Sequence, residues 1–148
     1  MVYNVQELSR YQDSHKLLYD YNKRIGCELD NDHLSEWLNK ILSVWEPLGI
    51  IVNVEIIAFL LLYCNNEETL EAYICNVYVD TRYRGMKLSS NLIDRAIRIC
   101  RDKQFKCINL DVAESNRPAL KIYKSCGFVE TERYYANKEY KLRMTYLL

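Results

Sequence analysis

Apolar residues recur at helical spacing in four segments of the chain. The first two segments lie near the N-terminus, and their pattern stops at Gly26 and before Pro47 and Gly49. The last of the four begins after Asn116 and stops at Gly127, which favours a short helix between them. The pattern therefore predicts helices over residues 9–25, about 31–45, 86–103 and 117–126.

The segments between these helices are dense in β-branched and large apolar residues, which is typical of strands. No helix separates the three strands expected between residues 49 and 79, so they form an antiparallel meander. The next strand follows a helix and is expected to pair in parallel with the last strand of the meander. The expected strands cover residues 2–5, 49–52, 56–64, 70–79, 107–112, 128–135 and 139–147.

These elements define an α+β fold in one domain over residues 1–148. We expect a mixed, mostly antiparallel sheet of about six or seven strands, flanked by about four helices. Where antiparallel pairing gives way to parallel pairing, neighbouring strand ends can splay apart. Such a gap suits an extended ligand.

Charge and composition remove several classes of protein. Lys+Arg and Asp+Glu balance at 20 each, so no basic excess favours nucleic-acid binding. The apolar runs are too short to span a bilayer, and the N-terminus has no secretory pattern, which predicts a cytoplasmic protein without a membrane partner. The spacing of the six cysteines and two histidines matches no metal site, so free thiols and no metal are expected.

The first candidate site is the stretch VYVDTRYRGMKLSS, where a strand ends near Val79 and a helix begins near Met86. The connecting loop carries Arg82, Arg84 and Gly85 to the positive end of that helix. Guanidinium groups and unpaired N–H groups at a helix N-terminus favour a phosphate or pyrophosphate. An ordinary strand–turn–helix connection with solvated arginines is the open alternative.

The second candidate site is the segment AESNRPALKIYKSCGF. Asn116 stands at the start of its helix, and Tyr123 lies at the edge of the apolar face, where its hydroxyl could reach a cleft. A tyrosine of the core or of its rim is the alternative explanation.

Together, the two segments resemble the GNAT superfamily of acyl-CoA-dependent N-acetyltransferases over about residues 58–148. The pattern N-x-x-A-x-x-x-Y-x-x-x-G-F is matched from Asn116 to Phe128, and Arg84-Gly85-Met86-Lys87-Leu88-Ser89 stands where the family has Gln/Arg-x-x-Gly-x-Gly/Ala. Lys87 and Ser89 depart from the family pattern. A side chain at the fourth position narrows the approach of the backbone to a pyrophosphate.

The resemblance implies direct transfer of an acetyl group from acetyl-CoA to a primary amine of a small molecule or protein, by a monomer or a homodimer. Tyr123 is the implied general acid for the thiolate of CoA. Glu71 is a candidate base acting through water, with an exposed strand-end glutamate or a water chain as alternatives. The implied cofactor-binding residues are Val77, Tyr78, Val79, Arg84, Gly85, Met86, Lys87, Leu88, Ser89, Asn116 and Tyr123.

A second function class stays open, namely a GNAT-fold module that binds acyl-CoA, or has lost it, and does not turn over. Lys87, Ser89 and the missing obvious base favour the module, whereas Arg84, Asn116 and Tyr123 together favour the enzyme. A P-loop nucleotide enzyme is excluded, because the sequence lacks G-x-x-x-x-G-K-[ST].

Overall fold

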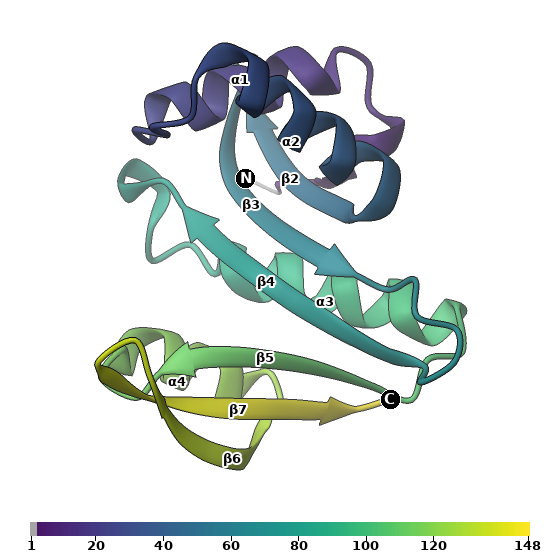
Figure 1. Cartoon of the computed structure of the whole chain (residues 1–148), viewed down its shortest axis with the longest axis vertical. Helices are drawn as coiled ribbons and strands as arrows, with labels where there is room; N and C mark the ends of the chain where they lie inside the picture. The colour runs from purple at the N-terminus through teal and green to yellow at the C-terminus, as the bar shows by residue number, and fades with distance from the viewer. Residues whose placement is uncertain (1–2) are drawn as a thin grey trace.

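The computed structural model describes residues 3–148, which form one seven-stranded sheet in the order β1-β2-β3-β4-β5-β7-β6. The strands are β1 (Val5–Glu7), β2 (Glu46–Val52), β3 (Glu55–Tyr63), β4 (Glu71–Val79), β5 (Cys107–Ala113), β6 (Val129–Ala136) and β7 (Glu139–Leu147). The helices are α1 (Ser14–Arg24), α2 (Asn31–Val44), α3 (Leu88–Asp102) and α4 (Arg117–Ser125), with 3₁₀ turns at Leu8–Arg10 and Thr81–Tyr83. The α+β fold with a mostly antiparallel sheet is thus confirmed (Figure 1).

The helices cover the sheet from both sides. Helices α1 and α2 pack on Ile56, Phe59 and Leu61 of β3, whereas α3 packs on the opposite face of the sheet, against Leu60 and Leu62. Because alternate side chains of a strand point to opposite faces, β3 is buried on both. Figure 1 shows α1 and α2 gathered over the β2–β3 end, while α3 and α4 lie behind β4 and β5.

Two helices begin later than the sequence predicted. Helix α1 begins at Ser14 rather than Ser9, because Leu8–Arg10 form a separate 3₁₀ turn and Asp13 has a φ of 59°. Helix α3 begins at Leu88 rather than at Met86, because Lys87 takes the left-handed conformation with a φ of 60°. In both cases a left-handed residue directly before the helix prevents an earlier start.

Pro47 and Gly49, expected to follow the second helix as breakers, lie inside β2. Strand β1 pairs only with Leu48, Gly49 and Ile50, so Pro47 lies beyond its end and its missing N–H costs no ladder bond. A Cβ on Gly49 would lie 3.0 Å from Leu8 Cδ1, which explains why glycine fits there. The strand expected at residues 2–5 is displaced: β1 is Val5–Glu7, so only Val5 is shared, residues 3–4 are not in a strand, and residues 1–2 lie outside the described part.

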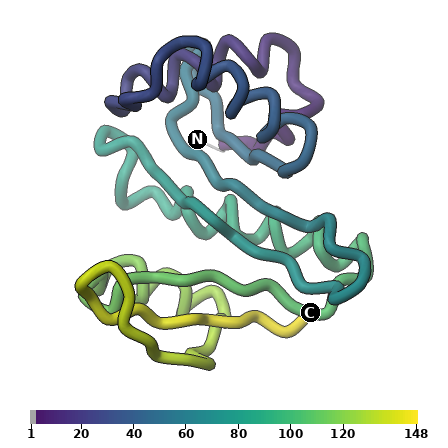
Figure 2. The backbone as a smooth tube through the Cα atoms, viewed as in Figure 1, coloured from purple at the N-terminus to yellow at the C-terminus, as the bar shows by residue number. Residues whose placement is uncertain are grey.

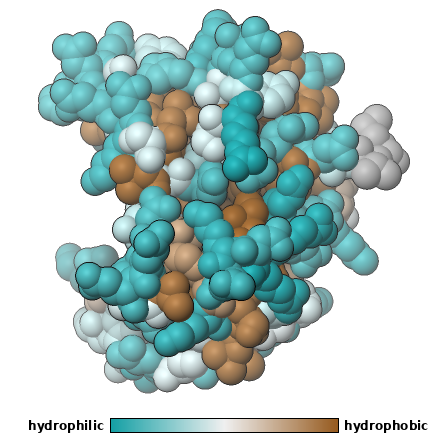
Figure 3. Space-filling view, turned by 90° about the vertical axis from the view of Figure 1, so that its right-hand side faces the viewer, coloured by the Kyte–Doolittle hydropathy of each residue, from teal (hydrophilic) through white to brown (hydrophobic). Residues whose placement is uncertain are grey.

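On α2, Leu34, Leu38 and Ile41 are buried against the sheet, whereas Trp37 is 37% exposed. Figure 3 shows one face of the molecule, on which apolar patches alternate with hydrophilic side chains. Within residues 3–148, no helix has the length and hydropathy needed to cross a membrane.

Strands β4 and β5 stop pairing about halfway along β4. The parallel ladder between β4 and β5 runs from Glu71–Cys107 to Ile74–Leu110 and then stops. At the same point the register of β3 against β4 shifts, so that Cys75 has no partner on β3. An extra residue of this kind bends its strand. Figure 2 shows β4 and β5 diverging from there, as the sequence predicted.

Candidate active site

The gap between the second half of β4 and the end of β5 (the notch, formed by Cys75–Val79 and Asp111–Ala113) presents free backbone groups. On its other side β4 pairs with β3, and the Asp80 N–H donates to Ile57 O at 2.8 Å. In an antiparallel pair the N–H groups of successive residues point alternately to the two sides. The N–H groups of Val77 and Val79 therefore point into the notch, where a carbonyl oxygen could accept from them.

The N-terminus of α3 lies at the end of the loop that follows β4. The first intrahelical bond joins Asn91 N–H to Lys87 O at 3.2 Å, so the N–H groups of Leu88, Ser89 and Ser90 have no partner within the helix. No side chain caps this end. Donors of this kind, together with the helix dipole, favour an anion.

Lys87 and Gly85 give the loop its shape, with φ angles of 60° and 80°. The left-handed conformation explains why a glycine suits position 87, and the lysine keeps that conformation at a cost of about 1–2 kcal/mol. The Lys87 side chain is exposed and does not fill the loop. Met86 is also exposed, at 48%, whereas Leu88 is buried and anchors the helix on the sheet.

The two arginines of the loop differ in their partners. Arg84 is exposed and donates through Nε to Val79 O at 3.2 Å, which leaves its terminal nitrogens available. Arg82 is bound by Asp80 through Nε at 3.0 Å and Nη2 at 2.9 Å, and by Glu55 at 3.1 Å. Hydrogen bonds from Arg82 lower the pKa of Asp80 to about 2. Of the two, Arg84 is therefore better placed to bind a phosphate.

Tyr123 lies on α4, with its ring centroid 6.2 Å from that of Phe128. One turn further on, the Cys126 thiol donates to the Ser90 hydroxyl at 3.9 Å, so α4 contacts the first turn of α3. Burial, and the nearby Cys126 thiol, raise the pKa of Tyr123. The hydroxyl of Tyr123 makes no hydrogen bond with any residue in 3–148. A phenol that stays protonated and has no partner in the described residues can donate a proton.

Neither Asn116 nor Glu71 belongs to the notch or to the loop before α3. The Asn116 side chain accepts from the Ala119 N–H at 3.3 Å and thus caps α4, about two turns before Tyr123 on the same helix. Glu71 is exposed at the start of β4, where the strands are still paired. At about 3.3 Å per residue, it lies about 20 Å along the strand from Val77. The structure does not bring Glu71 to the notch.

Three polar residues at the start of the notch were missed by sequence reasoning. The Tyr73 hydroxyl donates to Asp111 Oδ2 at 2.7 Å, and Arg143 of β7 donates to both oxygens of Asp111, at 2.9 and 3.0 Å. Arg143 lowers the pKa of Asp111, and burial together with Asp111 raises the pKa of Tyr73. The only signal in the sequence is a lone aspartate inside the apolar strand CINLDVA.

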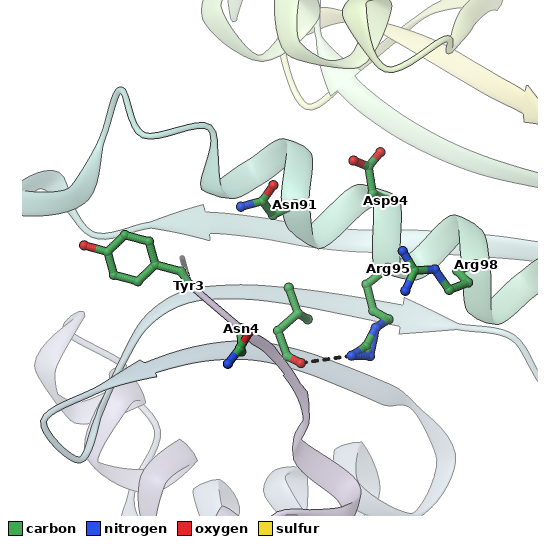
Figure 4. Close-up of a pocket in the computed structure, with 7 residues that line it drawn as sticks. Tyr3, Asn4, Asn91, Asp94, Arg95 and Arg98 are labelled. Carbon is green, nitrogen blue, oxygen red and sulfur yellow. Dashed lines mark hydrogen bonds between the residues drawn. The ribbon is translucent and has the colours of Figure 1, made fainter. Parts of the chain in front are cut away.

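A cavity of about 280 Å³ lies elsewhere, between the N-terminal strand and the outer side of α3 (Figure 4). Its lining includes Tyr3, Asn4, Asp94 and Arg98, and Arg95 donates across it to Val5 O at 3.2 Å. None of the loop, notch or Tyr123 residues lines it, so this cavity is not the candidate active site.

A splayed parallel strand pair, an uncapped helix N-terminus and a tyrosine on the next helix are the arrangement that the resemblance to acyl-CoA-dependent acyltransferases implied. Residues 10–128 match the family model described as Acetyltransferase (GNAT) family. This chain belongs to the GNAT family, as its sequence motifs indicated.

Known proteins resemble the chain in sequence and in structure. N-alpha-acetyltransferase MAK3 of Arabidopsis thaliana is 31% identical over 71 residues, which are 48% of this chain and 37% of that protein. The chain spans less than two fifths of the length of the first curated relatives it matches. A structure of the NatC complex bound to Gag peptide and CoA has a TM-score of 0.76 at 19% identity, covering 100% and 99% of the two chains. The ribosomal-protein-S18-alanine N-acetyltransferase of Escherichia coli has a TM-score of 0.75 at 18% identity, covering 99% and 94%.

Proposed function

We propose that this chain transfers an acetyl group from acetyl-CoA directly to a primary amine, and that the amine is the α-amino group of a polypeptide. The observation that carries the proposal is the notch, into which the Val77 and Val79 N–H groups point, at the end of β4 that leads through the loop to the N-terminus of α3. Acetyl-CoA supplies a thioester carbonyl and a thiolate leaving group. Relatives of the chain support this donor, because the NatC structure contains CoA.

Each part of the site has one task in this reaction. The N–H groups of Leu88–Ser90 and the Arg84 guanidinium bind the pyrophosphate. An N–H of Val77 or Val79 stabilises the oxyanion, and one such donor contributes roughly 3 kcal/mol to the transition state. The Tyr123 phenol, which burial keeps protonated, donates its proton to the departing sulfur.

The acceptor amine approaches from the side of the notch that carries Tyr73 and Asp111. Because the Tyr73 hydroxyl donates its proton to Asp111, the lone pairs of its oxygen remain free to accept from an ammonium group. Asp111 adds a negative charge, part of which Arg143 neutralises. This pair attracts and orients the amine, but an ion-paired carboxylate is a weak base.

A weak base favours an acceptor that loses its proton easily. At pH 7, about one α-amino group in seven is neutral, compared with about one lysine side chain in 2,500. An α-amine therefore needs no strong base, which fits the polar groups at this notch. Two similar proteins support an α-amine acceptor, because MAK3 is named an N-alpha-acetyltransferase and the Escherichia coli protein a ribosomal-protein-S18-alanine N-acetyltransferase.

The test combines isothermal titration with acetyl-CoA and a mass-spectrometric assay of peptides. One peptide set carries a free N-terminus, and a matched set carries an N-terminal block and one internal lysine. We expect micromolar binding of acetyl-CoA and acetylation of the free N-termini at a rate at least ten times that of lysine. Binding without turnover on either set would favour the non-catalytic module, and the absence of binding would overturn the proposed enzyme and favour a module that has lost acyl-CoA.

A further inference from the structure

A chain of four charged side chains joins α1 to the loop that precedes α3. Glu55, at the start of β3, accepts through Oε2 from Arg82 Nη2 at 3.1 Å, and the same oxygen forms an ion pair with Arg24 Nη1 at 3.3 Å. Arg24 ends α1 and also donates to the backbone oxygen of Ile56. Arg82 continues the chain to Asp80, which is buried.

The two arginines face each other across one carboxylate oxygen. One nitrogen of each guanidinium lies within hydrogen-bond distance of Oε2. These two nitrogens are therefore separated by no more than the sum of the two distances. The charge of Glu55 offsets the repulsion between them. Without that charge the two guanidinium groups repel each other, and Arg82 has more room to move than Arg24, since their side chains are 58% and 32% exposed.

Arg82 fixes the backbone that leads into the cofactor loop. Its own N–H donates to Asp80 Oδ1 at 2.9 Å and its guanidinium is bidentate on the same carboxylate, which closes the 3₁₀ turn Thr81–Tyr83. Arg84 and the first N–H groups of α3 follow directly. A shift of Arg82 therefore displaces the donors that bind a pyrophosphate.

We propose that Glu55 is a positioning residue for acetyl-CoA: by holding Arg82 against Arg24, it fixes the cofactor loop relative to α1. The proposal rests on the proposed function for its ligand, but it concerns a residue that touches neither the notch nor the ligand. Glu55 belongs to the β2–β3 hairpin, so this hairpin supports the loop from the side of the sheet that α1 covers.

The first test substitutes Glu55→Gln and measures acetyl-CoA affinity by titration calorimetry. We expect about a three- to fivefold weaker affinity, which corresponds to the loss of exposed ion pairs. The KM for acetyl-CoA rises by the same factor, while kcat at saturation is unchanged. Glu130→Gln is the matched control, because Glu130 has the same 47% side-chain exposure and an ion pair of 3.3 Å with Lys124. It should change neither value.

The double variant Arg24→Gln/Glu55→Gln separates positioning from a general loss of stability. Because it removes the facing charge as well, it should bind acetyl-CoA more tightly than Glu55→Gln alone, to within about twofold of wild type. Unchanged affinity in Glu55→Gln, or weaker affinity in the double variant than in the single one, would overturn the proposal.

Hydrogen exchange of the ligand-free protein tests the inference independently of the function. Amides of residues 82–88 should exchange faster in Glu55→Gln than in Glu130→Gln. If wild type does not bind acetyl-CoA, the proposed function fails, while the exchange rates still decide whether Glu55 holds the loop. Equal exchange in the two variants would contradict the positioning role.

Discussion

The hydroxyl of Tyr73 donates to Asp111 Oδ2 at 2.7 Å, one residue on either side of the point where β4 and β5 part. The bond joins the two strands just before the notch opens. Arg143 donates to both oxygens of the same carboxylate, so the orientation of Asp111 is fixed from two strands. This geometry suits a site that orients an amine at the entrance to the notch.

Tyr73→Phe should therefore impair the acceptor rather than the donor. We expect the KM of a peptide acceptor to rise about tenfold, which corresponds to one hydrogen bond to a charged group. Acetyl-CoA affinity, measured by calorimetry, should stay at its wild-type value. Tyr135→Phe is the control, because Tyr135 is 64% exposed on β6. A change confined to acetyl-CoA binding would assign Tyr73 to the donor side instead.

The pH dependence of kcat/KM should be set by the pKa of the acceptor's α-amino group. The pKa of Tyr73 is raised and that of Asp111 is lowered, so between pH 6 and pH 9 the phenol stays protonated and the carboxylate stays ionised. The rate constant kcat/KM should rise with pH through the pKa of the peptide α-amine, about 8, and then level off. Peptides whose α-amines have different pKa values would shift this midpoint. A midpoint that is identical for all peptides would indicate a titrating group of the enzyme.

Tyr123→Phe tests the general acid. Removing its hydroxyl should lower kcat at least tenfold, as the loss of a general acid commonly does. Acetyl-CoA affinity should change little, because the ring still packs on Phe128. Stopped-flow measurement of thiol release, with Tyr140→Phe as a control on an exposed tyrosine of β7, checks the result. A kcat equal to that of wild type would remove Tyr123 from the mechanism.

Local signals in the sequence predicted much of this site. Asn116, which the sequence placed at the start of its helix, caps α4, and Asp30 caps α2 by accepting from the His33 N–H at 2.9 Å. The parallel pairing of β4 with β5 followed from the helix between them. Caps and crossovers depend on residues close in sequence, which is why a single sequence shows them.

Features that depend on register across the sheet could not be predicted in the same way. The unpaired Cys75 depends on how β3 pairs with β4, and the contact of Tyr73 with Asp111 joins residues 38 positions apart. The loop shows a further limit: in the sequence, only the family motif distinguishes Arg84 from Arg82, and it gives no physical reason for the difference. Only the structure shows that Asp80 and Glu55 bind Arg82 and leave Arg84 available.

The left-handed conformation of Lys87 has an energetic consequence. At this position, Lys87→Gly should be more stable than Lys87→Ala by about 1 kcal/mol, because glycine adopts a positive φ without strain. At the exposed helical residue Arg98, the order should reverse, with alanine more stable than glycine by about 0.5–1 kcal/mol. Urea unfolding of the four variants measures both differences. The same order at the two positions would mean that Lys87 is helical in solution.

Asp80 should make the free energy of unfolding depend on pH in the acidic range. Its pKa is lowered to about 2 by hydrogen bonds from Arg82, so its contribution is present above about pH 4 and is lost as pH falls through that value of about 2. Asp80→Asn should therefore cost about 2 kcal/mol at pH 7, typical of a hydrogen bond to a charged group, and progressively less between pH 4 and pH 2. Urea unfolding of both proteins at several pH values measures the difference.

Asp20→Asn, which removes an exposed pair with Lys16, should show a much smaller and flatter difference. A constant difference from pH 7 to pH 2 would mean that the Asp80 side chain acts through its shape rather than through its charge.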